Sequence, residues 1–169
     1  MLARSRALRQ VVDGKTWTLC GTPDYLAPEI IRNEGHDKAV DYWALGVLVY
    51  ELVAGLPPFY ADDPIDVYEN VLNLKYELRE DAFSRNLADL LRRLLQLAQP
   101  KRLGNGRGGA RAISKHRWFA GFDWDGLLSY RLEPPFAVEL DASDDLRHFD
   151  VYDEDEARPE PCPEWNPEL

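Results

Sequence analysis

The sequence has no apolar run near the roughly 18 consecutive residues of a membrane-spanning helix, so no such helix is predicted. Its first residues, MLARSRALRQVV, lack a long apolar stretch and a small-residue cleavage site, so no secretory signal is predicted. Only Cys20 and Cys162 carry thiols, and their separation fits neither a disulfide framework nor a metal site. We therefore expect a reducing compartment, namely the cytoplasm, with the nucleus as the alternative.

An excess of positive charge is also absent, since the 169 residues carry a net charge of −10. Residues 137–169 contain twelve acidic and two basic side chains, whereas the remaining residues contain eighteen of each. A neutral body with an acidic tail gives no support to nucleic-acid binding. The tail after Asp153 is predicted to be a solvated, partly disordered segment.

Helical patterns dominate the rest of the sequence. Residues 38–54, KAVDYWALGVLVYELVA, are apolar on nearly every side, and this run is longer than an ordinary strand. It therefore predicts a buried helix that is capped by Asp37 and ends at Gly55. Shorter helices are predicted in DDPIDVYENVLN, capped by Asp63, in SRNLADLLRRLLQL, capped by Ser84, and in GARAISKHRWF. After Trp124 the sequence is rich in proline and acidic residues, and it predicts an extended segment that follows a surface.

Two motifs near the start suggest a family. TWTLCGTPDYLAPEII, residues 16–31, followed by DYWALG, resembles the activation segment and central helix of eukaryotic protein kinases. KRLGN, HRWF and HFDVYDEDE resemble the AGC group of Ser/Thr kinases. GHDKAVDYWALG and WFAGFDWDGL are most similar to cGMP-dependent kinases, and the catalytic subunit of cAMP-dependent kinase comes next.

The resemblance covers Lys15 to about Asp155 and implies a mainly α fold. It implies the C-terminal, large lobe of the kinase fold, without the β-rich N-lobe, followed by an extended AGC tail. The expected domains are a divergent segment 1–14, a partial kinase domain 15–122 and an acidic tail 123–169.

The resemblance also assigns a substrate-binding surface. Leu19, Pro23 and Leu26 would form an apolar pocket for the residue after the target hydroxyl. Thr22 would hydrogen-bond the catalytic aspartate of the intact family, and Asp24 and Glu51 would hold substrate arginines. Asp24 stands where the family usually has Glu, so its reach is shorter. The alternative interpretation is a set of ordinary loop side chains.

Three further assignments follow from the resemblance. Thr18 matches the activation-loop phosphosite, although the arginine and lysine that anchor that phosphate in the family are missing here. Glu29 and Arg102 match a buried structural ion pair, for which two exposed charges are the alternative. Phe149 and Tyr152 match the tail segment that crosses the nucleotide pocket of AGC kinases, or are simply two aromatics on an acidic tail.

The residues that perform phosphoryl transfer are not in this sequence. It contains no Gly-rich loop, strand lysine, His-Arg-Asp or Asp-Phe-Gly, and GNGRGG lacks the end of a P-loop. No catalytic residue or metal ligand is therefore predicted, and the three histidines are interpreted as non-catalytic. The intact family uses ATP and Mg²⁺, but we expect neither a cofactor nor ATP turnover for this chain alone.

Two hypotheses remain. The first is that the chain is part of a cyclic-nucleotide-dependent Ser/Thr kinase that phosphorylates proteins near basic residues. It would then supply the substrate surface and regulatory loop, and its partners would be basic protein substrates and the missing N-lobe or cyclic-nucleotide-binding region. The second is a non-catalytic, kinase-derived binding module.

Overall fold

The computed structural model describes residues 14–142 and 144–150 of the chain. This part is mainly helical and contains no β-strand, which confirms the predicted mainly α class; its one β-bridge joins Thr16 to His36. The chain divides into two units between Phe122 and Asp123, and each unit is described by itself. The described residues include no helix with the length and apolar character needed to cross a bilayer.

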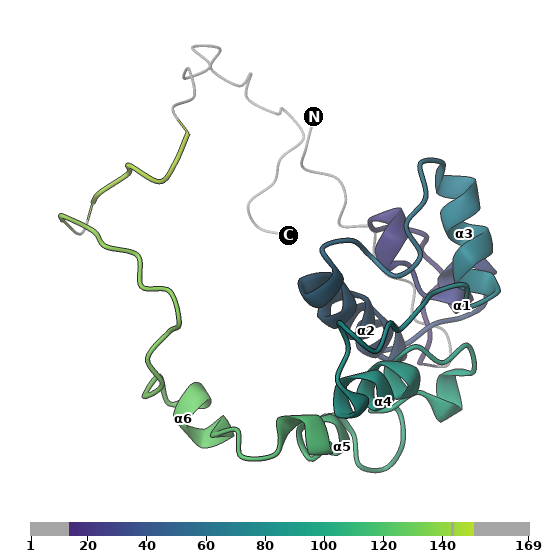
Figure 1. Cartoon of the computed structure of the whole chain (residues 1–169). Helices are drawn as coiled ribbons and strands as arrows, with labels where there is room; N and C mark the ends of the chain where they lie inside the picture. Colours follow the sequence, from purple (N-terminus) through teal and green to yellow (C-terminus); the bar gives the residue numbers. More distant parts are fainter. Residues whose placement is uncertain (1–13, 143, 151–169) are drawn as a thin grey trace, which may run out of the picture. The chain divides into compact units, whose positions relative to one another are not determined.

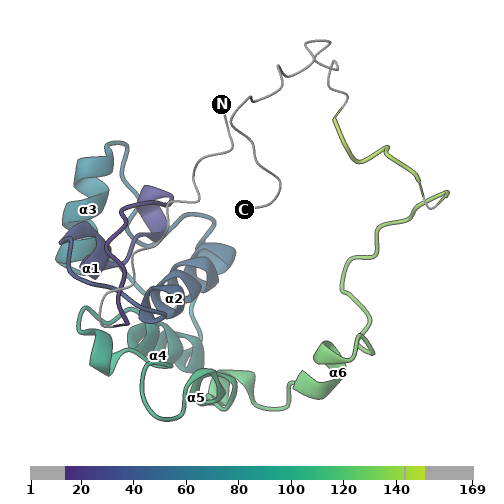
Figure 2. The same cartoon turned by 180° about the vertical axis from the view of Figure 1, so that it is seen from behind.

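The first unit contains five α-helices and three short 3₁₀ turns among its described residues (Figures 1 and 2). The helices are α1 Pro28–Ile31, α2 Ala39–Ala54, α3 Pro64–Leu72, α4 Arg85–Leu94 and α5 Ala110–Ser114. The turns are η1 Pro23–Tyr25, η2 Gln99–Lys101 and η3 Arg117–Phe119. Asp63 and Ser84 cap α3 and α4 as predicted, since their side chains accept hydrogen bonds from Ile65 N and Leu87 N.

Helix α2 begins one residue later than predicted. Lys38 occupies the N-cap position and makes no capping hydrogen bond through its side chain. The Asp37 carboxylate instead accepts a hydrogen bond from Ala39 N at 2.8 Å, so the acid satisfies the first turn from one position further out. Gly55 ends the helix in the left-handed conformation, with φ of 80°, as its predicted terminating role requires.

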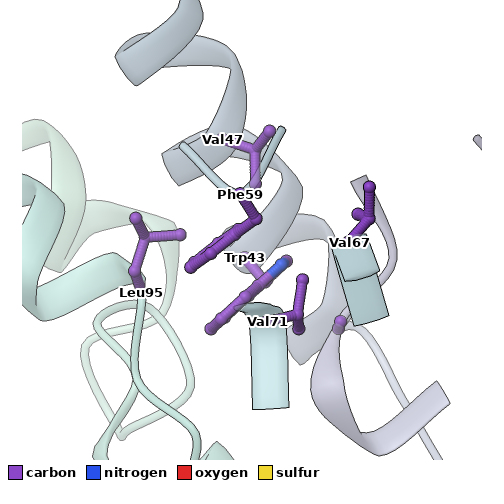
Figure 3. Close-up of a cluster of buried hydrophobic side chains, with 7 residues drawn as sticks. Trp43, Val47, Phe59, Val67, Val71 and Leu95 are labelled. Atoms are coloured by element: carbon purple, nitrogen blue, oxygen red, sulfur yellow. The ribbon is translucent and has the colours of Figure 1, made fainter. Parts of the chain in front are cut away.

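The core of the first unit is built around Trp43 on α2 (Figure 3). The Trp43 ring stacks on Phe59 with centroids 5.4 Å apart, and Val67 and Val71 of α3 and Leu95 after α4 belong to the same buried cluster. Trp43 and Phe59 are both 0% exposed. The central helix therefore packs between α3 and the end of α4. The prediction of burial on nearly every side is only partly correct, because Leu48 and Leu52 of the same helix are exposed.

Helices α2 and α4 approach each other closely at Gly46. A Cβ atom on Gly46 would lie 2.9 Å from Leu95 Cδ2 and 3.0 Å from Leu94 Cβ. These contacts would be too close, so a larger residue would not fit unless the leucine side chains moved. The absence of a side chain at this one position allows the two helices to pack against each other without a gap.

The single helix predicted in GARAISKHRWF is wrong, because α5 ends at Ser114 and a separate 3₁₀ turn follows. His116 separates the two elements: its Nδ1 accepts a hydrogen bond from Trp118 N, and its Nε2 bonds to the Asp89 carboxylate of α4 at 3.0 Å. Tethering of this imidazole to α4 breaks the helix, a tertiary contact that local periodicity does not encode.

Asp89 holds η3 to α4. Its Oδ2 atom lies within 3.0–3.1 Å of His116 Nε2, Arg93 Nε and Arg117 Nη2. The hydrogen bond from His116 is the largest cause that lowers the pKa of Asp89; Arg93 and Arg117 add to it, and partial burial opposes it. The carboxylate form is therefore favoured in the folded protein.

We expect this arrangement to make stability depend on pH at the acid end. Because the folded pKa of Asp89 lies below its unfolded value, its contribution is complete above that value and disappears as the pH falls through the folded pKa. When the pH falls below about 4, the Asp89→Asn variant should therefore lose less free energy of unfolding than the wild type does, as measured with urea. Asp81→Asn, at an exposed pair with Arg79, is the matched control. Parallel pH curves for wild type and Asp89→Asn would contradict the expectation.

The second unit begins with a helix, α6 Trp124–Leu128, where an extended segment is predicted. The Asp123 carboxylate accepts a hydrogen bond from Gly126 N at 2.8 Å and so starts this helix. From residue 129 to 142 and from 144 to 150 the described chain has no helix or strand, which agrees with its proline-rich composition.

Candidate functional site

The loop that carries the kinase-like motif is fastened near its start. Thr16 and His36 exchange two backbone hydrogen bonds of 2.9 and 3.0 Å, and Thr16 Oγ1 bonds to His36 Nε2 at 2.8 Å. Gly35 makes this approach possible, because a Cβ there would lie 2.8 Å from Lys15 Cδ and 3.0 Å from the Trp17 ring. His36, interpreted from sequence as non-catalytic, therefore holds the loop beside the start of α2.

A cavity of about 700 Å³ lies beside this fastening. Thr18, half-buried, shares its lining with His36, Lys38, Asp37 and Asp41. The structure thus places the predicted phosphosite in one cavity with a histidine, a lysine and two acidic side chains from the start of α2 and the residues before it. A phosphate on Thr18 would share this cavity with the Lys38 cation and with two carboxylates.

The two acids that the resemblance assigns to substrate arginines both lie near Tyr25. The Tyr25 hydroxyl donates a 2.5 Å hydrogen bond to Glu51 Oε2 of α2. That bond, followed by burial and the negative charges of Glu51 and Asp24, raises the pKa of Tyr25 to about 12. The phenol consequently keeps its proton throughout the physiological range and holds the Glu51 carboxylate in place.

Asp24 contributes a second carboxylate to the same place. Its Oδ1 atom is shielded from solvent and accepts no hydrogen bond within the described ranges. A shielded oxygen without a donor is costly, and a guanidinium group would satisfy it with a charge-assisted bond. Asp24, Tyr25 and Glu51 are called the acidic cluster below.

The residues assigned to the apolar pocket do not share one environment. Leu19 is 64% exposed, Pro23 is half-buried at the start of η1, and Leu26 is 5% exposed and packs toward the core. Thr22, which was expected to bond to a catalytic aspartate, is exposed and makes no side-chain capping bond to η1. Leu19 offers the most open apolar surface of the three, while Pro23 and Leu26 expose less, and the pocket stays a prediction.

Glu29 and Arg102 form the best-defined polar contact of the first unit. Arg102 Nη1 and Nη2 donate to the two Glu29 oxygens at 2.7 and 2.9 Å, and both residues are 1% exposed. The guanidinium also donates to the carbonyls of Ala39 and Gln96 and lies 5.2 Å from the Trp43 ring centroid. One side chain thus joins α1, the start of α2 and the segment after α4.

The assigned tail residues lie in the second unit. Phe149 is 71% exposed, and Tyr152 falls outside the described residues. The described part of the chain contains no group of three His, Cys, Asp or Glu side chains that could hold a metal ion.

The acidic cluster and the buried pair both lie in a region that matches one known family. The sequence matches the protein kinase domain over residues 5–119. This match covers more than half of the chain, which therefore belongs to the protein kinase family.

Individual relatives identify the family more narrowly than the domain match does, and they confirm the resemblance to cyclic-nucleotide-dependent kinases. The mouse cAMP-dependent protein kinase catalytic subunit PRKX is 43% identical over 149 residues, which are 88% of this chain and 41% of that protein. The Drosophila melanogaster cGMP-dependent protein kinase, isozyme 1, is 50% identical over 139 residues, or 82% of this chain and 18% of that protein. The chain therefore spans less than half of the length of either relative.

Sequence reasoning missed two residues of this site. Tyr25 was interpreted only as part of a motif, yet it positions Glu51 from 26 residues away. His36 was set aside, yet it anchors the loop to the segment before α2. Both act through contacts distant in sequence, and only the tyrosine inside the Gly-Thr-Pro-x-Tyr motif carried a signal that could have indicated its role.

Proposed function

We propose that this chain is the large-lobe portion of a cyclic-nucleotide-dependent Ser/Thr protein kinase of the AGC group. Its task is to hold a protein substrate so that a Ser or Thr near basic residues faces the nucleotide bound by the remainder of the kinase, with ATP and Mg²⁺ as the family's cofactors. The observation that carries this is the acidic cluster, in which Tyr25 fixes the Glu51 carboxylate and Asp24 keeps an unpartnered, shielded oxygen.

The cluster suits a substrate with arginines. Two carboxylates on neighbouring elements, one held by a neutral phenol, can each accept from a guanidinium, so they favour a basic peptide over a neutral one. Thr18, in its cavity beside His36 and Lys38, is the proposed regulatory phosphosite, and exposed Leu19 is the apolar contact for the residue after the target hydroxyl.

An exposed face of α2 supports the remaining part of this proposal. Leu48 and Leu52 lie four residues apart on the helix and are 43% and 76% exposed, and Leu56 just beyond it is 54% exposed. An apolar stripe on a central helix is normally covered. We assign it to the missing part of the kinase domain. Residues 123–169 are proposed as the AGC tail, and the location as cytoplasmic, with the nucleus as the alternative.

A non-catalytic, kinase-derived binding module is the second candidate. It is favoured by the acidic cluster itself, because these carboxylates can bind a basic peptide without any phosphoryl transfer. Both candidates use the acidic cluster to bind basic peptides, so phosphoryl transfer separates them.

The test joins this chain to the preceding part of the kinase domain of the mouse PRKX relative. The chain alone is expected to transfer no phosphate to an arginine-containing peptide, and the joined protein is expected to do so. In the joined protein, Glu51→Gln should raise KM for that peptide about tenfold or more and leave kcat near its original value, since one charge-assisted bond is lost from ground state and transition state alike.

Glu69→Gln is the matched control, because Glu69 is an exposed acid on α3 outside the cluster. Transfer by the purified chain alone would overturn the proposal. A joined protein that melts cooperatively and binds nucleotide but transfers no phosphate would favour the binding module. An unchanged KM in Glu51→Gln would remove the acidic cluster from the substrate site.

A further inference from the structure

The neutral net charge of the body conceals two regions of opposite sign. Residues 14–100 carry eight basic and fourteen acidic side chains, a net charge of −6. Residues 101–122 carry six basic side chains and no acidic one, a net charge of +6. The body therefore contains a cationic segment, which begins at Lys101 in η2 and ends at the boundary of the first unit.

Most of these cations face solvent. Arg102 forms the buried salt bridge with Glu29, and Arg117 forms a salt bridge with Asp89. The other four are exposed, and within the part of the chain that the structure describes none of them pairs with a carboxylate; they are Lys101, Arg107, Arg111 and Lys115. Their charge is thus available to a partner.

The local fold groups these side chains. Arg111 lies in α5 and Lys115 caps its C-terminal end, four residues later, so both side chains project from one side of the helix. Arg107 precedes α5 in a turn closed by the Gly109 N to Gly106 O hydrogen bond, and Asn105 ties this turn to η2 through Gln99 O at 2.9 Å. The cations are consequently carried by one continuous stretch of short, mutually bonded elements.

Exposed aromatic side chains follow directly after the cations. Trp118 and Phe122 are 37% and 46% exposed, and both line an open hollow of about 400 Å³ together with Phe119, Ala120 and Gly121. The residues of this hollow belong neither to the acidic cluster nor to Asp89 and the three side chains that it binds. Lys101, Arg107, Arg111, Lys115, Trp118 and Phe122 are called the cationic–aromatic surface below.

We propose that the cationic–aromatic surface binds peripherally to an anionic lipid bilayer. Lys and Arg are attracted by the negative potential of such a bilayer, and Trp is the side chain most suited to its interface, where an apolar body and a polar N–H are both accommodated. Cations alone would serve an acidic peptide equally well. The Trp118 ring packs edge-on against Phe119, yet Trp118 and Phe122 both keep exposed apolar surface that a bilayer interface would receive. The proposal is independent of phosphoryl transfer.

The net charge of the chain does not oppose this binding at physiological salt. The screening length there is about 8 Å, so acidic groups further away act weakly on headgroups in contact with α5. Binding through four cations of this kind is expected to be reversible and to weaken steeply with added salt.

Cosedimentation of the full chain with vesicles tests the proposal. The chain should bind vesicles of phosphatidylcholine with about one-third phosphatidylserine at low salt, release at high salt, and stay in solution with phosphatidylcholine alone. Arg111→Gln/Lys115→Gln should lower the partition coefficient about 30-fold, because each cation near such a surface contributes roughly a fivefold factor. Lys101→Gln/Arg107→Gln is an independent pair for which the same loss is expected.

Lys75→Gln/Arg79→Gln is the matched control, since it removes two exposed cations from the acidic region and leaves the cationic–aromatic surface intact. Trp118→Phe should retain most of the binding that Trp118→Ser loses, and unchanged melting temperatures confirm that each variant is folded. Absence of binding to anionic vesicles, or an equal loss in the control, overturns the proposal. Tighter binding to a single-stranded oligonucleotide, or salt-sensitive self-association without vesicles, assigns the surface to another partner and overturns it too.

Discussion

Replacing Arg102 by alanine is expected to lower the free energy of unfolding by about 3–5 kcal/mol, because it leaves the Glu29 carboxylate buried without a partner. The same change removes the bonds to the Ala39 and Gln96 carbonyls, so three segments lose a common hydrogen-bond donor. Urea or thermal unfolding of the full chain followed by circular dichroism measures the difference. An effect of this size is a large fraction of the stability of a domain.

Two further variants give this experiment its interpretation. Lys101→Ala changes the neighbouring exposed cation and should alter stability by less than about 0.5 kcal/mol. The double variant Glu29→Leu/Arg102→Met replaces both charges by apolar groups and should be much more stable than Arg102→Ala alone, since no charge stays buried unpaired. A loss below about 1 kcal/mol in Arg102→Ala would mean that the carboxylate is solvated and that the pair does not organise the fold.

Replacing Trp43 by alanine is expected to cost a similar amount, about 3–5 kcal/mol. Its ring is fully buried, stacks on Phe59 and lies beneath the Arg102 guanidinium, so alanine would leave a cavity at the centre of the first unit. Trp43→Phe keeps most of the apolar contact and should cost distinctly less. The measurement is again the free energy of unfolding of the full chain.

Trp17→Ala is the control for this substitution, because Trp17 is half exposed. It should change stability little. A double-mutant cycle that combines Trp43→Leu with Arg102→Met removes both the ring and the guanidinium, and their interaction is expected to contribute about 0.5–2 kcal/mol. Equal losses in Trp17→Ala and Trp43→Ala would contradict the central position of Trp43 in the core.

The elements that sequence predicted well are those decided by local chemistry. Asp63 and Ser84 cap their helices as expected, and Gly55 ends α2, because caps and left-handed termini depend on residues a few positions apart. The family was likewise recognisable, because its motif is contiguous over residues 16–31. Helix existence and family could therefore be predicted from sequence alone.

The elements that sequence predicted poorly depend on distant contacts. His116 breaks the helix expected in GARAISKHRWF because its ring is bound by Asp89, 27 residues earlier. Tyr25 owes its role to Glu51, which lies on another helix. The neutral body charge is correct as a sum, and counting by segment would already have separated the charges at Lys101. Only the structure shows which of those cations are exposed and which are paired.

The close approach at Gly46 has a geometric consequence. Gly46 presents only a hydrogen, so α2 lies directly against the Leu94 and Leu95 side chains, and a larger residue there would push the two helices apart. Glu51 lies on the same helix, and Tyr25 joins it to the η1 turn that carries Asp24. The spacing between α2 and α4 therefore also sets where the acidic cluster stands relative to α4.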